Sequence, residues 1–207
     1  MSSFPSQQLD SAASYCDGYF VALAEAAKTI DRAAVARAAE VLTEAILGGR
    51  TIYSCGNGGS AAIADHLTCD FLKGIRTDTD VRPRVVSLVS TISLVTAIAN
   101  DIGYDEAFSF QLESMGQPGD VLMAVSSSGG SPNIVRAVEL AKAQGMTSIV
   151  MTGFSGGASR LAADVSIHVQ ADNYGVIEDL HQSVMHLLAQ YIRQSRVDPE
   201  RFASVKF

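Results

Sequence analysis

The chain has 207 residues, of which 47% are hydrophobic, so it is long enough to bury the core of one α/β domain. Its formal net charge of −7 and its lack of a dense Lys/Arg cluster argue against a nucleic-acid-binding surface. No apolar run reaches the roughly 18 residues of a transmembrane helix, and the N-terminus lacks the basic and apolar regions of a secretory signal. We therefore expect a soluble, cytoplasmic protein without a membrane or nucleic-acid partner.

Two helices are predicted near the N-terminus, over residues 7–28 and 32–49. Asp31 can cap the second helix, which is rich in alanine and ends at a glycine pair. Alanine-rich helices with apolar residues on more than one face commonly pack against other helices, in many cases across a subunit boundary. These two helices therefore favour self-association.

Strands and helices alternate from residue 50 onward. Short β-branched runs predict strands at residues 50–55, 84–89, 120–126, 147–152 and 164–169. Helical stretches fall between them or after them, at residues 60–73, 105–116, 132–144 and 175–195. Strands that are apolar throughout and alternate with helices indicate a parallel sheet covered on both faces. We expect one domain over residues 1–207, with N-terminal helices over 1–49, an α/β core over 50–195 and a tail over 196–207.

Two glycine- and serine-rich loops follow predicted strands, at the edge where open parallel sheets bind ligands. The first loop contains Asn57, Gly58, Gly59 and Ser60, and the second contains Ser126, Ser127, Ser128 and Ser131. Each loop opens a helix, and Ser131 can be the N-cap of the second one. Glycines let a ligand approach closely, while free backbone N–H groups, the helix dipole and serine hydroxyls attract an anion.

Ordinary strand-to-helix turns are the alternative interpretation of these loops, because such turns also favour glycine and serine. Neither loop contains a P-loop motif or a complete dinucleotide-binding glycine motif. The second loop has four serines within six residues, which exceeds what a turn requires. The sequence therefore favours a monophosphate site at the second loop.

Three motifs together carry a resemblance to a known family. They are GNGGSAAIADH at residues 56–66, SSSGGSPN at residues 126–133 and IEDLHQSVMH at residues 177–186. In combination they resemble the phosphoheptose isomerase branch of the SIS (sugar isomerase) family, over essentially the whole chain to about residue 195. The resemblance implies a three-layer α/β/α, flavodoxin-like SIS fold with a five-stranded parallel sheet and an N-terminal helical extension. It also implies a homotetramer with active sites between subunits.

The resemblance implies that sedoheptulose 7-phosphate is converted to D-glycero-D-manno-heptose 7-phosphate, a precursor of lipopolysaccharide or capsule. Such an isomerase needs a base that removes a proton next to a carbonyl and a partner that moves protons between the enediol oxygens. The family's catalytic glutamate falls on Asp70 and its catalytic histidine on His186. A substrate-orienting aspartate of the family falls on Asp101, for which a loop-capping role is an equally good interpretation.

In zinc-binding members of the family, the ligands fall on His66, Asp70, Glu178 and His186 of this chain. Glu178 replaces the family's glutamine, which also contacts substrate, and a carboxylate binds a divalent cation more strongly. The resemblance thus predicts one zinc per subunit, although Glu178 lies about 80° around an ideal helix from His186 and can join only from a distorted first turn. His66 and Asp70 share a helix face, where a surface i,i+4 pair is the alternative.

Three functional alternatives stay open at this stage. The site could work without metal, with Asp70 as the base and His186 as the acid. The substrate could be another sugar phosphate. The chain could also be a non-enzymatic SIS regulator, resembling the protein that binds the bacterial replication initiator. Retention of His66, Asp70 and His186 favours chemistry, because a scaffold has no need to keep them together.

Overall fold

The computed structural model describes residues 4–206 and contains one sheet of five parallel strands in the order β2-β1-β3-β4-β5. The strands are β1 (Thr51–Gly56), β2 (Arg84–Ser87), β3 (Val121–Ser126), β4 (Thr147–Thr152) and β5 (Val165–His168). The register places Ser126 of β3 opposite Thr152 of β4, and Thr152 opposite His168 of β5. The predicted five-stranded parallel sheet is therefore confirmed, and its carboxyl edge gathers polar side chains.

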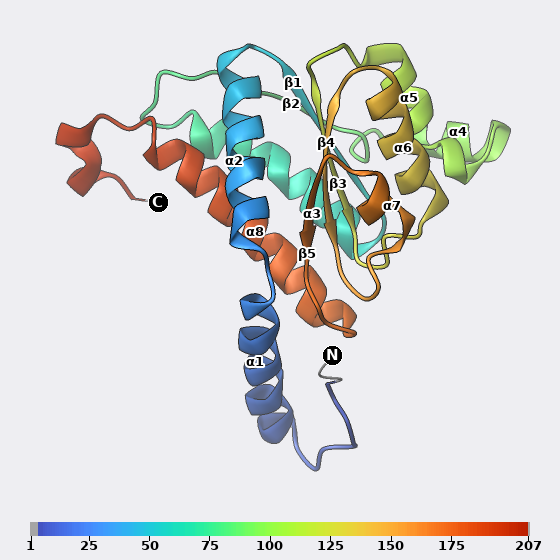
Figure 1. Ribbon diagram of the computed structural model, residues 1–207, viewed down its shortest axis with the longest axis vertical. Coiled ribbons are helices and arrows are strands. Elements are labelled where there is room, and N and C mark those ends of the chain that lie inside the picture. Colours follow the sequence, from blue (N-terminus) through green and yellow to red (C-terminus); the bar gives the residue numbers. More distant parts are fainter. Residues whose placement is uncertain (1–3, 207) are drawn as a thin grey trace.

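Helices cover both faces of the sheet (Figure 1). The α-helices are α1 (Ala12–Lys28), α2 (Arg32–Leu47), α3 (Gly59–Cys69), α4 (Ile92–Asp101), α5 (Ser109–Met115), α6 (Pro132–Ala143), α7 (Gly157–Ala162) and α8 (Tyr174–Gln194). A π-helix, η1 (Asp70–Ile75), and two 3₁₀ segments, η2 (Tyr104–Glu106) and η3 (Pro199–Ser204), complete the described elements. The sequence interpretation missed α4 and α7. It also began α1 too early, because Ser11 caps this helix by accepting from the backbone N–H of Ser14 at 3.1 Å.

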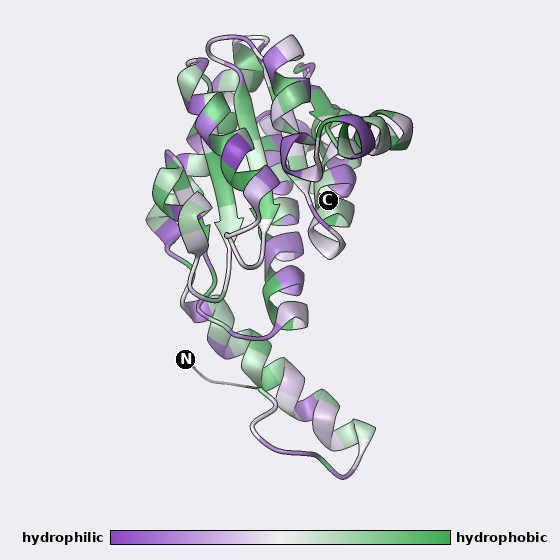
Figure 2. Cartoon of the chain, turned by 90° about the vertical axis from the view of Figure 1, so that its right-hand side faces the viewer, coloured by the Kyte–Doolittle hydropathy of each residue, from purple (hydrophilic) through white to green (hydrophobic). Residues whose placement is uncertain are grey.

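The alternation of strand side chains explains why the strands are apolar throughout. Ile52, Met123 and Ile149 belong to one buried core, which they share with residues of α2, α3 and α8. Tyr53 and Leu122 belong to a second core, shared with residues of α5 and α6. Figure 2 shows the hydrophobic colour of the strands between these helical layers. Two separate cores on the two faces of one sheet make the three-layer α/β/α sandwich.

Helix α1 projects from the body and contacts it mainly through α8 (Figure 1). The Tyr19 hydroxyl donates to Asp179 Oδ2 at 2.6 Å, at the start of α8. Tyr15, Phe20 and Val21 of α1 are exposed, and the exposed fraction of Val21 reaches 64%. A helix of this kind leaves apolar surface uncovered in the isolated chain.

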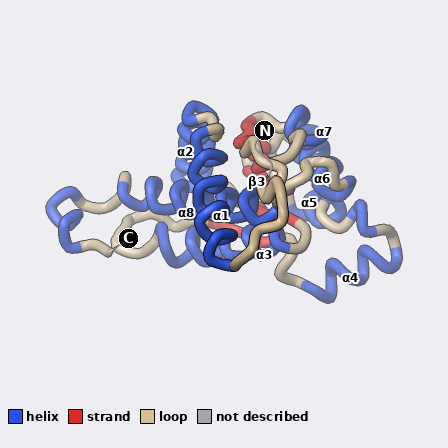
Figure 3. The backbone as a smooth tube through the Cα atoms, turned by 90° about the horizontal axis from the view of Figure 1, so that it is seen from below, coloured by secondary structure: helices blue, strands red, loops and turns tan. Residues whose placement is uncertain are grey.

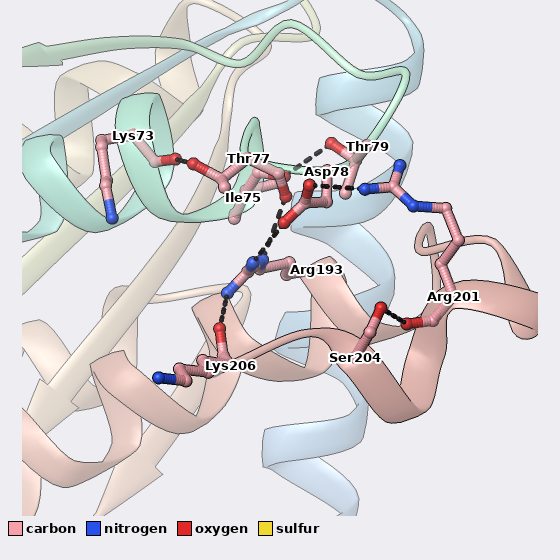
Figure 4. Close-up of polar contacts among 9 residues, drawn as sticks. All are labelled: Lys73, Ile75, Thr77, Asp78, Thr79, Arg193, Arg201, Ser204 and Lys206. Carbon is pink, nitrogen blue, oxygen red and sulfur yellow. Dashed lines mark hydrogen bonds and ion pairs between the residues drawn. The ribbon is translucent and has the colours of Figure 1, made fainter.

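The C-terminal segment extends from the opposite side of the core to α4 (Figures 1 and 3). Arg193 of α8 is buried and donates to the backbone oxygens of Thr77 and Lys206, at 3.0 and 2.7 Å (Figure 4). Asp78 accepts from Arg193 at 3.1 Å and from Arg201 at 3.0 Å. The tail expected over residues 196–207 thus contains η3 and, within the described residues, is bound to the loop that follows η1. Further along, Arg196 donates to Asp80 at 3.2 Å.

None of the helices described within residues 4–206 is long and apolar enough to cross a membrane.

Candidate active site

The first glycine loop is a tight turn between β1 and α3. Gly58, the N-cap of α3, has φ 56°, a backbone conformation that favours glycine. A Cβ on Gly56 would collide with the backbone oxygen of Ser60, so the chain can fold back here only without a side chain. The loop therefore brings the amino end of α3 to the carboxyl edge of the sheet.

The serine loop joins β3 to α6. Its turn is closed by the backbone N–H of Gly129, which lies 3.1 Å from both the backbone oxygen and the hydroxyl of Ser126. Ser131 is the N-cap of α6, as predicted, and Pro132 occupies the first turn. Ser127 is buried, and its hydroxyl has no hydrogen-bond partner within the described residues. A buried hydroxyl in this state is available to a ligand.

The two loops together line a cavity of about 140 Å³. Its walls are Asn57, Ser60, Ser126, Ser127, Ser128, Ser131, Tyr174 and Glu178. All of these except Tyr174 were predicted to bind substrate, and the predicted Gly58 and Gly59 form the adjoining turn. Tyr174 is the first residue of α8, and no sequence pattern singled it out.

Glu178 lies over the amino end of α3, where a Cβ added to Gly59 would collide with its carboxylate. Burial raises the pKa of the Glu178 carboxyl, and the neighbouring Asp179 raises it further. The positive end of the α3 dipole favours a negative charge, and in this structure the Glu178 carboxylate lies there.

Three of the four predicted metal ligands meet at one point between α3, η1 and α8. Asp70 Oδ2 lies 2.6 Å from His186 Nδ1, and Asp70 Oδ1 lies 3.2 Å from His66 Nε2. The two imidazole rings are 5.0 Å apart at an interplanar angle of 85°. Ligand atoms of all three residues lie within 4.8 Å of one another. The predicted pairing of the carboxylate with both imidazoles is present in the structure.

Glu178 lies outside this cluster. An eight-residue separation along α8 amounts to about 12 Å of rise and about 80° of rotation from His186. The first turn of α8 is an ordinary α-helical turn, capped by Asn173. This turn lacks the distortion that would bring Glu178 to the same metal site as His186. Of the four predicted ligands, the structure therefore gathers only His66, Asp70 and His186.

Gln182 completes the surroundings of His186, and the sequence interpretation missed it. Its Nε2 lies 2.8 Å from His186 Nε2, one helical turn away. An ionised Asp70 can only accept, so Nδ1 of His186 carries the proton that it donates. In the neutral imidazole Nε2 is then the acceptor of the Gln182 amide, which fixes the tautomer and the ring orientation. The i,i+4 spacing of Gln182 and His186 was the available signal.

Asp70 stands where α3 changes into the π-helix η1. Asp70 is both the C-cap of α3 and the first residue of η1, and the wider turn of η1 interrupts the regular α-helix. Single π-helical turns within α-helices occur frequently at functional sites, because they alter the direction in which a side chain points.

The donors of the cluster fit a divalent metal. Two imidazoles and one carboxylate form a set that zinc uses in catalytic sites, with a further position left for water or substrate. The Asp70 carboxylate between two imidazoles could also serve as an acid–base group without metal. The structure therefore accommodates both of the chemistries considered from the sequence.

The other predicted or ionisable residues lie elsewhere. Asp101 ends α4, is exposed, and accepts from the Asn100 amide at 2.7 Å. Asp101 does not line the serine cavity, and both its substrate-orienting role and its loop-capping role stay predictions. His168 bonds to the Thr152 hydroxyl at 3.0 Å, and His181 is fully buried in α8. Burial lowers the pKa of both imidazoles, that of His181 to about 4.

Comparison with known proteins assigns the chain and its fold to a family. The model of the SIS domain matches residues 14–153, so the chain belongs to the SIS domain family. The phosphoheptose isomerase of Shewanella denitrificans is 41% identical over 161 residues, which cover 76% of this chain and 82% of that protein. The phosphoheptose isomerase of Shewanella frigidimarina is 42% identical over 161 residues, 76% of this chain and 81% of its own.

Solved structures agree with this assignment. A phosphoheptose isomerase from Francisella tularensis superimposes with a TM-score of 0.81 at 31% identity, over 88% of this chain and 96% of that one. A second, from Neisseria gonorrhoeae, gives a TM-score of 0.79 at 32% identity, over 87% and 95% of the two chains. Within the family, the resemblance to the phosphoheptose isomerase branch that the motifs carry is confirmed.

Proposed function

We propose that this protein is an aldose–ketose isomerase that converts sedoheptulose 7-phosphate to D-glycero-D-manno-heptose 7-phosphate. The observation that carries the proposal is the hydrogen bond between Asp70 and His186, together with the serine-lined cavity at the amino ends of α3 and α8. Relatives that are 41% and 42% identical bear the name phosphoheptose isomerase. In this proposal the cavity binds the phosphate, and the Asp70–His186 pair performs the proton transfers.

The spacing of the two parts favours a long substrate. Gly59, at the phosphate end, and His66, at the acid–base cluster, are seven residues apart on α3. This separation corresponds to about 10 Å along the helix axis. An extended seven-carbon sugar phosphate can bridge it, whereas a three-carbon one cannot. The geometry thus supports a longer-chain sugar phosphate over a triose phosphate.

The proton transfers follow from the positions of the two groups. Asp70 removes a proton from C1 of the open-chain ketose, which leaves an enediolate over C1 and C2. His186, entering as the imidazolium, donates its Nε2 proton to O2 and then accepts the proton of O1 at the same nitrogen. Asp70 then returns its proton to C2, which gives the aldose and restores both side chains. Gln182 holds the His186 ring in the orientation that these steps require.

We also propose one zinc per subunit at His66, Asp70 and His186, with Glu178 as a further ligand if the first turn of α8 is distorted when the metal binds. When bound, the metal would supply a Lewis acid that polarises the substrate carbonyl and stabilises negative charge on oxygen. The two imidazoles and the carboxylate within 4.8 Å of one another support this part of the proposal.

Self-association completes the proposal. The exposed apolar residues of α1 and a groove of about 570 Å³ between α2 and α8 offer surface for further copies of the chain. The groove is lined in part by Val35, Ala39, Leu187 and Tyr191. We propose a homotetramer of single-domain subunits. A cytoplasmic location and the lack of a nucleic-acid partner stay predictions from the sequence.

Turnover of sedoheptulose 7-phosphate, measured together with bound zinc, tests the proposal. We expect His186→Ala to lose nearly all activity, because it removes the proton donor to O2. Lys142→Ala, at an exposed position near the end of α6, is the control and should keep wild-type activity. We expect stoichiometric zinc in the wild type and weaker retention in Glu178→Gln.

Each contrary outcome removes a different part of the proposal. A wild type that does not turn over sedoheptulose 7-phosphate would refute the proposed substrate. Full activity of His186→Ala would refute the proposed acid–base pair. Full activity after exhaustive chelation would exclude the metal and leave the acid–base mechanism in place.

A further inference from the structure

Three side chains join the two ligand-binding loops and η2 in one hydrogen-bonded cluster. Asn57 Nδ2 donates to Asn133 Oδ1 at 2.9 Å, and Asn133 Nδ2 donates back to Asn57 Oδ1 at 2.9 Å. The Tyr104 hydroxyl donates to the same Asn57 oxygen at 2.8 Å. Asn57 belongs to the first glycine loop, Asn133 to the first turn of α6, and Tyr104 to η2. The cluster therefore fixes the two loops relative to each other.

The bonding pattern determines what Asn57 can offer to a ligand. An amide oxygen accepts two hydrogen bonds, and both are supplied here by Asn133 and Tyr104. The amide nitrogen has two hydrogens, of which one is used by Asn133. Asn57 lines both the serine cavity and a neighbouring cavity of about 380 Å³ that Tyr104 and Asn133 also line. Because Tyr104 approaches the amide oxygen, we take the remaining N–H to point the other way, to the serine cavity. An N–H suits a phosphate oxygen, whereas a carbonyl oxygen in the same place would repel it.

The two hydrogen bonds between Asn57 and Asn133 do not by themselves determine which way the Asn57 amide is turned. If the Asn57 and Asn133 amides turned over together, both of their mutual hydrogen bonds would be kept. Tyr104 opposes that change, because its hydroxyl would then face a nitrogen and lose the oxygen to which it donates. The hydroxyl of Tyr104 thus decides which end of the Asn57 amide faces the cavity.

Tyr104 is itself held in place by ion pairs on η2. Arg136 of α6 lies 2.7 Å from Asp105 and also pairs with Glu106. Glu106 in turn accepts from the Ser109 hydroxyl at 2.5 Å. The two residues after Tyr104 are therefore tied to α6, the helix that carries Asn133. The Tyr104 side chain is 52% exposed, so its hydroxyl can be removed without opening the core.

We infer that Tyr104 is a positioning residue for substrate binding, and that it acts through the Asn57 amide without touching the phosphate. The inference rests on the proposed function of the serine cavity as a phosphate site. Phosphate binding contributes equally to the ground state and the transition state, so its loss raises KM and leaves kcat unchanged.

Steady-state kinetics on sedoheptulose 7-phosphate with Tyr104→Phe tests the inference. One lost neutral hydrogen bond corresponds to an increase in KM of about threefold to tenfold. We expect that increase with kcat changed by less than about twofold. Tyr15→Phe, which removes the same hydroxyl from α1, is the control and should leave both constants unchanged. Asn57→Ala should raise KM by itself, and adding Tyr104→Phe to it should have no further effect.

Two results would overturn the inference. One is an unchanged KM in Tyr104→Phe, and the other is the same rise in KM with and without Asn57. If the wild type does not turn over the sugar phosphate, the proposed function fails separately. Calorimetric binding of inorganic phosphate then decides the inference: Tyr104→Phe should weaken it by the same factor, and an unchanged Kd would refute the role of Tyr104.

Discussion

The buried imidazole of His181 should make folding stability depend on pH. Burial lowers the pKa of His181 from an ordinary value of 6.5 to about 4, while the Thr152 backbone opposes this effect and His168 adds to it. Between these two pKa values the unfolded chain binds a proton that the folded chain excludes. The contribution of His181 to stability is therefore complete above pH 6.5 and is lost as the pH falls toward 4. A difference of about 2.5 units corresponds to a loss of about 3 kcal/mol.

Chemical denaturation of the wild type at several pH values between 4 and 7 measures this loss. His181→Leu and His181→Gln should both flatten the dependence, because neither side chain titrates. The Leu variant tests packing without a polar group, and the Gln variant keeps one. Some slope should persist in both, since burial also lowers the pKa of His168. If both variants kept the full wild-type slope, the assignment of the pH dependence to His181 would be refuted.

Two further predictions concern the cavity and the assembly. Changing Ser126 and Ser128 together to alanine removes two hydroxyls from the cavity wall, and each hydrogen bond to a charged phosphate is worth about 1.5–3 kcal/mol. Calorimetry should show at least tenfold weaker binding of the sugar phosphate, and an unchanged affinity would remove the serine loop from the site. Light scattering at micromolar concentration should report a mass well above the 21.8 kDa of one chain, because α1 and the α2–α8 groove leave apolar surface exposed. A monodisperse monomer would contradict the proposed tetramer.

The sheet and the longest helices could be predicted because their signals are local. Each strand is a short apolar run followed by glycine, serine or polar residues, and α8 has an amphipathic pattern over five turns. Helix α4 was missed because residues 92–101 contain several β-branched side chains and no cap that bonds to the backbone. Helix α7 has only six residues, too few for a helical period to emerge.

The site was predicted in its parts and less well in its assembly. The i,i+4 spacing placed His66 beside Asp70, and the motif resemblance paired Asp70 with His186 from a helix 116 residues away. The position of Glu178 depends on how α8 packs over Gly59, which no local pattern encodes. Tyr104 and Tyr174 lie at the ends of loops, and only the tertiary fold brings them to Asn57 and to the serine cavity.

Residues 186–196, in α8 and just beyond it, contact the segment that begins at Asp70, and these contacts advance in step along both segments. Asp70 with His186, Thr77 with Arg193 and Asp80 with Arg196 are each separated by the same 116 residues. The two segments therefore run in the same direction with matched lengths, from the Asp70–His186 pair to the contacts of Arg193 and Arg196. Inserting or deleting one residue within either segment would put the Asp70–His186 pair out of register with the contacts of Arg193 and Arg196. Among members of this branch, differences in length should accordingly fall in the loops outside these two segments.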